Sequence, residues 1–231
     1  MASQESGYLT ELMAAFPAAQ LTSHLLADAE AMIQLRYQSL LDNWVDSREM
    51  LSRLDSTSEG YFSSFFEELG KLSHRTLYGG VLSNAGSYRQ AAEPNGGTVY
   101  FGPYSRGHSE FTGTPADKIE GELSQVFRHL VKNASDPVSA ATIFYQQFVR
   151  VHPFYDANGR ICRLLVSVYL DYHRRYVDWD TLHSQGDWIH KLNACHKRQG
   201  QHLYNTYLGR LIDYFAGHVR SKSEFELELD E

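Results

Sequence analysis

Apolar side chains recur at helical spacing along most of the chain, and this pattern predicts a mainly α-helical protein. The first such segment covers residues 21–54, which fits one or two helices, and Thr22 or Ser23 is suited to cap its start. The next covers residues 61–78, where apolar and polar groups alternate with a helical period before two consecutive glycines. We therefore expect helices in both segments.

The second half of the chain continues this periodicity. Helical spacing resumes at Pro115, with acidic residues in the first turns. Asp136 is suited to cap a helix over residues 138–151, whose apolar positions form one stripe. Because Pro153 disfavours helical geometry in the residue before it, that helix should end at about His152.

A further helix follows after a short loop, and its core face is set by Ile161, Leu164, Leu165, Val168 and Tyr172. Residues 181–219 predict two more helices, and the acidic stretch 221–231 is expected to form a loose tail. We therefore expect an all-α fold in which one helical domain, residues 61–220, carries an N-terminal helical extension over residues 1–60.

One segment departs from the helical pattern. Residues 81–114 are rich in Gly, Ser, Asn and Thr, and they contain the clearest hairpin signal in the chain. This signal is a turn followed by a β-prone run, Pro94-Asn95-Gly96-Gly97 and then Thr98-Val99-Tyr100-Phe101. We predict one short β-hairpin at about residues 93–104, although the Asn-Gly pair taken alone is more typical of an ordinary surface turn.

The composition limits the classes of protein that this chain can represent. With 231 residues, of which 42% are hydrophobic and 13% aromatic, it has enough apolar mass for a sizeable core, which excludes an intrinsically disordered chain. A formal net charge of −7 argues against holding nucleic acid through the overall field of the protein. We therefore expect no nucleic-acid partner, and any anionic ligand has to be held locally.

The cysteines and the N-terminus bear on location. Cys162 and Cys195 lack the spacing of disulfide frameworks and zinc sites, which favours a reducing compartment. The N-terminus has no basic region followed by an apolar run, and no stretch approaches the roughly 20 apolar residues that a membrane span needs. We expect a cytoplasmic protein with no membrane partner, and secretion as an effector stays open by a route that uses no cleaved signal peptide.

The stretch HPFYDANGRICR, residues 152–163, concentrates the chemistry of the chain. Arg160 and Arg163 lie at the start of a helix, where the partial positive charge of the N-terminus makes each arginine cost on the order of 0.3–1 kcal/mol. A bound anion reverses that cost. We therefore predict a phosphate site built from these two guanidinium groups and from the amides of Ala157, Asn158 and Gly159.

Asp156 and His152 add reactive groups to this site. A carboxylate beside a phosphate repels it unless a hard cation such as Mg²⁺ bridges the two, so a nucleotide with its metal fits both charges. His152 is the nearby group that titrates near neutral pH, and it is suited to take a proton from a hydroxyl that attacks phosphorus. These are the parts that phosphoryl or nucleotidyl transfer requires.

Simpler interpretations exist for each residue alone. A histidine before proline is usually a helix end and Asp-Ala-Asn-Gly is usually a turn, but their concentration in one loop favours a site. An EF-hand is a poor match because its alternating acids and closing glutamate are missing here. Phe154 is most simply a core anchor for the loop.

Outside this loop, three histidines recur at intervals of six residues, which place them on different faces of a helix: His190, His196 and His202. This spacing favours solvated or capping roles over a metal site.

The segment HPFYDANGR matches in full the signature of the Fic (Fido) family, His-x-Phe-x-Asp/Glu-Gly/Ala-Asn-Gly/Lys-Arg, and Arg163 matches the arginine that follows it. Upstream, LSHRTLYGGVLSNAGSYR resembles the family's helix and Ala-Gly-x-x-Arg element, and PNGGTVYFGP resembles its flap hairpin. The resemblance covers about residues 65–175. It implies a helical fold that transfers the AMP of ATP onto a protein hydroxyl, with residues 152–160 as the catalytic loop, as in bacterial toxins and effectors.

The resemblance also implies roles for single residues. His152 would deprotonate a Ser, Thr or Tyr of the target protein, and Asp156 would hold Mg²⁺ on the phosphates of the co-substrate ATP. The phosphates themselves would be held by the anion hole and by two arginines, which together comprise Ala157, Asn158, Gly159, Arg160 and Arg163. The flap would align the target's main chain as an added strand, through Asn95, Gly96, Gly97, Thr98, Val99 and Tyr100.

Three alternatives stay open within this resemblance. Relatives that transfer UMP or phosphocholine share the loop, those that transfer a bare phosphate carry Lys where this chain has Gly159, and a catalytically silent binding module would keep the fold. Many members inhibit themselves through a helix with Ser/Thr-x-x-x-Glu-Gly/Asn. Here Ser63…Glu67 and Ser64…Glu68 have the spacing but lack the closing residue. We therefore expect a separate small antitoxin-like inhibitor whose glutamate would meet Arg163.

Overall fold

The computed structural model describes residues 9, 11–16, 23–42, 59–105, 108–184 and 186–221. Its helices are α2 (Ser23–Asp42), α4 (Glu59–Tyr78), α5 (Ile119–Lys132), α6 (Pro137–Val151), α7 (Asn158–Tyr172), α8 (Trp179–Ser184), α9 (Asp187–Arg198) and α10 (Tyr204–Ala216). Its strands are β1 (Tyr100–Ser105), β2 (His108–Thr112), β3 (Arg175–Val177) and β4 (Val219–Ser221). The predicted all-α fold with a short hairpin is confirmed, and the acidic tail beyond residue 221 lies outside the described residues.

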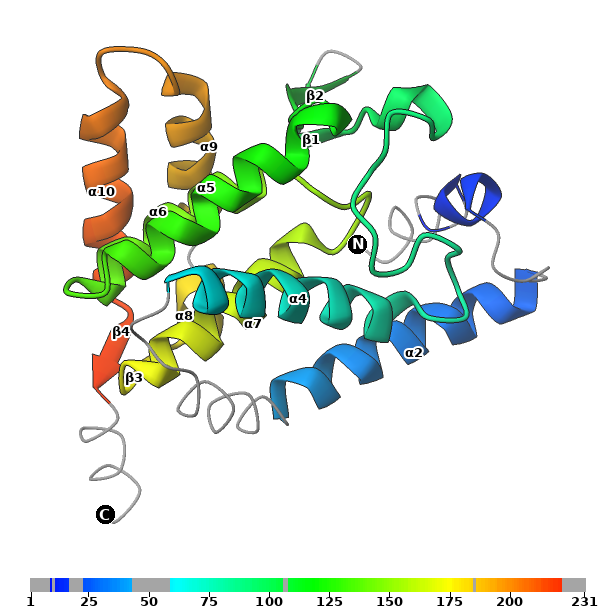
Figure 1. Ribbon diagram of the computed structural model, residues 1–231, viewed down its shortest axis with the longest axis horizontal. Helices are drawn as coiled ribbons and strands as arrows, with labels where there is room; N and C mark the ends of the chain where they lie inside the picture. The colour runs from blue at the N-terminus through cyan, green and yellow to red at the C-terminus, as the bar shows by residue number, and fades with distance from the viewer. Residues whose placement is uncertain are drawn as a thin grey trace.

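Helices α6 and α7 form the centre of the fold (Figure 1). Helix α6 packs against α5, α7, α9 and α10, and α7 packs against α6, α4, α2 and β3. Helix α6 begins where the sequence predicted, because the Asp136 carboxylate accepts a hydrogen bond of 3.2 Å from the Ser139 backbone N–H and Pro137 fills the first helical position. The loop that joins these two buried helices is 152–157, so the core itself holds the candidate site in place.

The N-terminal helix α2 lies along α4 and also reaches α7 (Figure 1). Its inward face buries Ala29, Ile33 and Tyr37, and the guanidinium of Arg36 donates to the carbonyls that end α4, at Leu77 (3.1 Å) and Gly79 (2.9 Å). Helix α2 therefore closes one side of the fold, next to the start of α7. The rest of the predicted segment, 43–54, lies outside the described residues.

The hairpin lies later in the chain than the sequence predicted. Asn95 and Gly96 do adopt the left-handed geometry of an Asn-Gly turn, with φ of 55° and 61°, but Pro94–Gly97 is a 3₁₀ turn rather than the tip of a hairpin. The preceding residues cannot supply a partner strand because Gln90 and Glu93 are bonded to each other in a turn of their own. Strand β1 pairs instead with the later strand β2, in antiparallel register from Tyr100 opposite Thr112 to Ser105 opposite His108.

Two further differences lie in the C-terminal third. A short helix, α8, precedes α9 and α10, so the predicted pair of helices over residues 181–219 is incomplete. Strands β3 and β4 form a second antiparallel pair, Arg175–Val177 with Val219–Ser221, which was not predicted. Helices α9 and α10 stand as an antiparallel pair at one end of the molecule, next to the hairpin (Figure 1). Both helices pack against α6.

Candidate active site

His152 ends helix α6 in the left-handed conformation, with φ 53° and ψ 59°. Its backbone N–H still bonds the Phe148 carbonyl (3.0 Å), and its ring Nδ1 lies 3.2 Å from the Val149 carbonyl. A carbonyl can only accept a hydrogen bond, so Nδ1 carries the proton and Nε2 carries the lone pair. The ring of Phe101 stacks on the imidazole, with centroids 4.5 Å apart and planes 13° apart. The imidazole is therefore held in one orientation and one tautomer.

The surroundings of His152 keep it neutral. Burial lowers the pKa of His152 to about 4, and the nearby guanidinium of Arg89 acts in the same direction. At neutral pH the side chain is therefore in the form that can accept a proton, although it is a weaker base than a solvated histidine.

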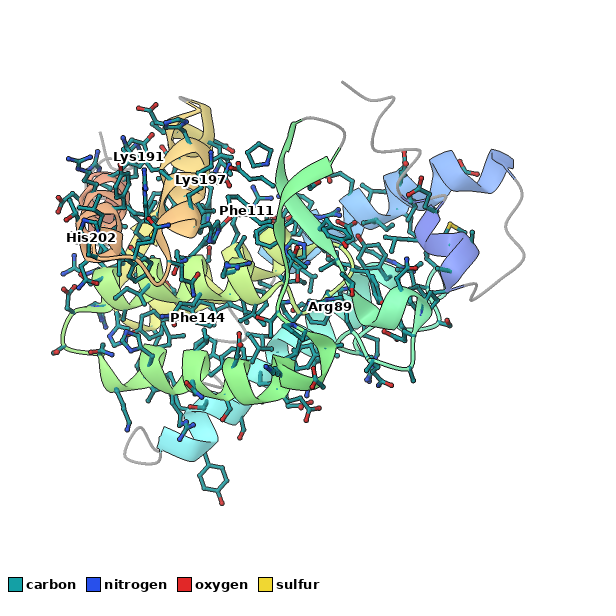
Figure 2. All side chains as sticks on the ribbon, turned by 90° about the horizontal axis from the view of Figure 1, so that it is seen from above. Arg89, Phe111, Phe144, Lys191, Lys197 and His202 are labelled. Atoms are coloured by element: carbon teal, nitrogen blue, oxygen red, sulfur yellow. The ribbon has the colours of Figure 1, made fainter. Side chains whose placement is uncertain are left out.

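Arg89 joins the hairpin to the loop 152–157. Its side chain is 2% exposed, and it donates to four carbonyls: His152 (2.8 Å), Thr114 (2.9 Å), Val151 (3.2 Å) and Gly97. Two of these acceptors end helix α6, and the other two flank the hairpin on either side. Figure 2 shows Arg89 at the base of the hairpin. One guanidinium group thus fixes the distance between the hairpin and His152.

Gly113 allows this close approach. A Cβ atom placed there would lie 2.8 Å from Val99 Cγ2, 2.9 Å from Arg89 Nη2 and 3.2 Å from the Cβ of His152. No larger residue fits without moving the hairpin away from the loop, so the position requires glycine. Neither Arg89 nor Gly113 was singled out from the sequence. Arg89 is the arginine of the Ala-Gly-x-x-Arg element, and this motif was the feature of the sequence that could have identified it.

The loop itself is tied down by Asn158 and Phe154. The Asn158 amide accepts from the Phe154 N–H and donates to the Phe154 carbonyl, both at 2.9 Å. Phe154 is 1% exposed and stacks on His74, with centroids 4.1 Å and planes 8° apart. The side chain of Asn158 is thus occupied within the loop, which leaves its backbone N–H as the group available to a phosphate, and binding there stays a prediction.

Ala157 immediately precedes helix α7 with φ 60° and ψ 9°, a left-handed conformation that a Cβ disfavours. The first N–H groups of a helix have no acceptor within it. Ala157, Asn158, Gly159 and Arg160 all border the same cavity, so the start of α7 lies against it. At Gly159 an added Cβ would have Tyr145 Oη as its nearest neighbour, at 4.0 Å, so packing alone does not require glycine there.

Asp156 and Arg160 form an ion pair rather than acting separately. Arg160 Nη2 lies 3.0 Å from Asp156 Oδ2 and 2.9 Å from the hydroxyl of Tyr78, and that hydroxyl in turn donates to Asp156 Oδ2. Tyr78 is fully buried at the end of α4. It was not expected in the site, because a tyrosine at helical spacing is indistinguishable from an ordinary core residue.

Arg163 faces the N-terminal helix. Its guanidinium lies over the ring of Tyr37, 5.6 Å from the centroid. The pKa of Tyr37 is raised by burial, although the positive charges of Arg163 and Arg160 oppose the shift. Helix α2 therefore takes part in the site through Tyr37, which contacts Arg163. The apolar periodicity of residues 21–54 did not indicate this contribution.

All seven residues predicted for catalysis, metal and phosphate binding border one cavity of about 800 Å³: His152, Asp156, Ala157, Asn158, Gly159, Arg160 and Arg163. The remaining wall comes from Tyr78 and from the N-terminal part of the chain, with Leu9, Glu30, Ile33 and Gln34. Glu30 is a second acidic group in this wall, in addition to Asp156. The two stretches that match the inhibitory spacing are elsewhere, on α4, where Glu67 and Glu68 pair with Lys71 at 2.9 and 3.5 Å.

The residues predicted for target docking do not border this cavity. Asn95, Gly96 and Thr98 are exposed in and after the 3₁₀ turn, Val99 is buried, and Tyr100, at 66% exposure, is the one that belongs to strand β1. In the described part of the chain the hairpin is a two-stranded sheet, and Arg150 donates to the carbonyl of Thr112 at the end of β2. The predicted docking residues therefore lie mostly before the hairpin of residues 100–112, and target docking stays a prediction.

Helix α9 supports the hairpin. His196 is 5% exposed and its ring meets the edges or faces of Phe101 and Phe111, with centroids 5.7 and 5.5 Å apart, while Lys197 pairs with Glu110 at 2.9 Å. Figure 2 shows Lys197 on α9 beside the hairpin and Phe111 on the hairpin side that faces α9. His196 is thus buried and bonded to Gln146 (3.1 Å), which corrects the expectation of a solvated or capping role. His190 and His202 are exposed.

The comparisons with known proteins agree with this geometry. The Fic/DOC family model matches residues 65–170, so this stretch is a Fic-family domain and the family prediction is confirmed. Members of this family transfer AMP or other groups onto proteins. No curated protein matches the chain. None of the described helices is long and apolar enough to cross a membrane.

Solved structures share the fold over most of the chain. The N-terminal Fic domain of a Bartonella effector protein from Bartonella sp. AR 15-3 has a TM-score of 0.58 and 14% identity, covering 88% of this chain and 91% of that one. The N-terminal Fic domain of Bep8 from Bartonella sp. 1-1C has a TM-score of 0.55 and 11% identity, with coverages of 84% and 86%. A Fic domain from Bartonella quintana, solved with bound ADP, has a TM-score of 0.50 and 13% identity, with coverages of 84% and 89%.

Proposed function

We propose that this protein transfers AMP from ATP to a Ser, Thr or Tyr hydroxyl of a target protein and releases pyrophosphate. The observation that carries the proposal is the placement of a neutral His152, with Nε2 as its basic nitrogen, on the same cavity as two arginines and the first amides of α7. A family member that resembles this fold binds ADP, which supports a nucleotide as co-substrate.

The reaction uses these groups in a simple order. The target hydroxyl gives its proton to Nε2 of His152 as its oxygen attacks the α-phosphorus of ATP. The new O–P bond replaces the bond from the α-phosphorus to the bridging oxygen, and pyrophosphate leaves with that electron pair. Arg160, Arg163 and the first amides of α7 stabilise the charge that builds up on the phosphates. The edge of the hairpin holds the target's main chain beside His152.

The donor set suits magnesium. Asp156 borders the cavity with 31% of its side chain exposed, and the described residues contain no cluster of three or more acids, histidines and cysteines. One carboxylate combined with substrate phosphates is the way in which Mg²⁺ is commonly held. When bound, Mg²⁺ would neutralise phosphate charge and orient the phosphates. Asp156 would be its protein ligand, and Arg160 would leave Asp156 to meet the phosphates.

Mass spectrometry of modified proteins tests the proposal. Purified protein, Mg²⁺ and an equimolar mixture of ATP, UTP and CDP-choline are incubated with lysate of the native host, and modified peptides are identified by the mass of the added group. We expect AMP on a hydroxyl side chain. An adduct of UMP, phosphocholine or bare phosphate would show that another group is transferred instead of AMP, and no adduct under any condition would favour a silent binding module.

The antitoxin-like inhibitor stays part of the proposal, and purification from the host would show whether a small protein accompanies the chain.

A further inference from the structure

Tyr78 contacts both the proposed metal ligand and the first phosphate-binding arginine. Its hydroxyl donates to Asp156 Oδ2 and accepts from Arg160 Nη2 at 2.9 Å, while Arg160 Nη2 also bonds Asp156 Oδ2 at 3.0 Å. Both donors share the same carboxylate oxygen, so neither occupies Oδ1. The ring is fully buried and lies 4.9 Å from that of His74, which fixes the position of the hydroxyl.

This arrangement poses a conflict that the hydroxyl resolves. Without a ligand, Arg160 and Asp156 neutralise each other across the mouth of the phosphate site. When phosphate binds, Arg160 has to turn away from Asp156. If Arg160 were the sole hydrogen-bond donor to Asp156, its departure would leave a partly buried carboxylate without a partner, at a cost in free energy. Tyr78 is a second donor to the same oxygen, so Asp156 stays hydrogen-bonded after Arg160 leaves.

We infer that Tyr78 is a positioning residue of the nucleotide site, which keeps Oδ2 of Asp156 engaged so that Oδ1 is presented to Mg²⁺ while Arg160 moves to the phosphates. The inference rests on the proposed function for the identity of the site. On this inference, Mg²⁺ increases the affinity for phosphates more when the Tyr78 hydroxyl is present than when it is absent. Tyr78 itself does not contact the nucleotide.

Titration calorimetry on the full chain tests this with two probes, ATP and inorganic tripolyphosphate, each in excess Mg²⁺ and in EDTA. Tyr78→Phe keeps the ring and removes the hydroxyl. We expect it to bind both probes about tenfold more weakly in Mg²⁺ and nearly unchanged in EDTA, as suits the loss of one hydrogen bond to a charged group. Tyr88→Phe is the matched control, since Tyr88 is also buried but packs against Phe154 and has Glu67 as its charged neighbour.

Equal affinity of Tyr78→Phe and the unaltered chain in Mg²⁺ would overturn the inference, as would an equal loss in Mg²⁺ and in EDTA. A double-mutant cycle supplies a second readout, because Tyr78→Phe should have no further effect in an Asp156→Ala background. An additive loss there would show a merely structural role. Tripolyphosphate has no base or ribose. If ATP bound no more tightly than tripolyphosphate, the result would count against AMP transfer. The affinities of Tyr78→Phe and the unaltered chain for tripolyphosphate, in Mg²⁺ and in EDTA, would still decide this inference.

Discussion

The ring of Phe101 lies flat on the imidazole of His152, with centroids 4.5 Å apart and an angle of 13° between the planes. Phe101 belongs to β1 and His152 ends α6, so the contact joins the strand that would hold the target to the group that would activate it. Phe101 also contacts the His196 ring on α9, with centroids 5.7 Å apart and planes at 89°. The position of the proposed base therefore depends on the hairpin, and the hairpin depends on α9.

Replacing Phe101 by Leu should lower kcat about tenfold with little change in ATP affinity, because small misplacements of a catalytic group are costly while the phosphate site is untouched. Phe101→Tyr keeps the ring and serves as the control. Steady-state transfer assays and nucleotide titrations on the three proteins provide the measurement. Equal kcat for the Leu and Tyr variants would show that the stacked ring does not position His152.

The acid limb of the pH profile should report the lowered pKa of His152. Burial and Arg89 bring this pKa to about 4, below the ordinary value of 6.5, so the base form persists well into the acid range. We expect kcat/KM to stay nearly constant from neutral pH to about pH 5 and to fall tenfold per pH unit only below about pH 4. A limb centred near pH 6.5 would contradict the buried environment of His152.

Stability limits how far that profile can be followed. The pKa values of His74 and His196 are also lowered, each to about 3, by burial. The unfolded chain binds protons on these residues below about pH 6.5 and the folded chain does not, so the free energy of unfolding falls as the pH drops below that value. Circular dichroism at each pH therefore has to accompany the kinetics.

Arg89→Lys should lower the free energy of unfolding by about 3 kcal/mol, because an ammonium group cannot reach the four carbonyls that the buried guanidinium serves. Urea denaturation measures this loss. Limited proteolysis should also cut faster within residues 98–114, since the base of the hairpin is released. Arg128→Lys is a suitable control, because Arg128 is exposed and its guanidinium bonds only the Ser124 carbonyl one turn away among the described contacts. Unchanged stability of Arg89→Lys would mean that the hairpin is anchored elsewhere.

Much of the fold could be predicted because buried helices repeat with a regular period. The apolar stripe of α6, its Asp136 cap and its end just before Pro153 all depend on neighbouring residues. The cavity-lining residues of the loop 152–163 could be predicted for the same reason, since the start of α7 gathers them within a few positions. The sequence around the loop was therefore sufficient to predict this half of the candidate site.

The other half depends on contacts between residues far apart in the chain. Tyr78, Tyr37 and Glu30 reach the loop from α4 and α2, and nothing in their own neighbourhoods distinguishes them from core or surface residues of a helix. The hairpin was misplaced because an Asn-Gly turn forms locally whether or not strands flank it. Arg89 bonds the carbonyls of Gly97 and Thr114 on the two sides of the hairpin, and apolar periodicity does not predict contacts between residues so far apart in the chain.

Glu30→Gln should raise the affinity for ATP with Mg²⁺ a few-fold, about threefold to tenfold, because Glu30 places a negative charge in the wall of a cavity that has to accept a triphosphate. Glu67→Gln on α4 is the control, since its carboxylate pairs with Lys71 outside this cavity. Calorimetric titration gives both values. Unchanged affinity of Glu30→Gln would place the phosphates away from α2.

The most direct test of the account is AMP transfer with and without His152. The unaltered chain and His152→Ala are incubated with Mg²⁺, host lysate and ATP labelled at the α- or at the γ-phosphate. We predict that label enters protein from the α position only and is lost in His152→Ala, while nucleotide titration shows that the variant still binds ATP. Label from the γ position, or undiminished transfer by His152→Ala, would contradict AMP transfer with His152 as the base.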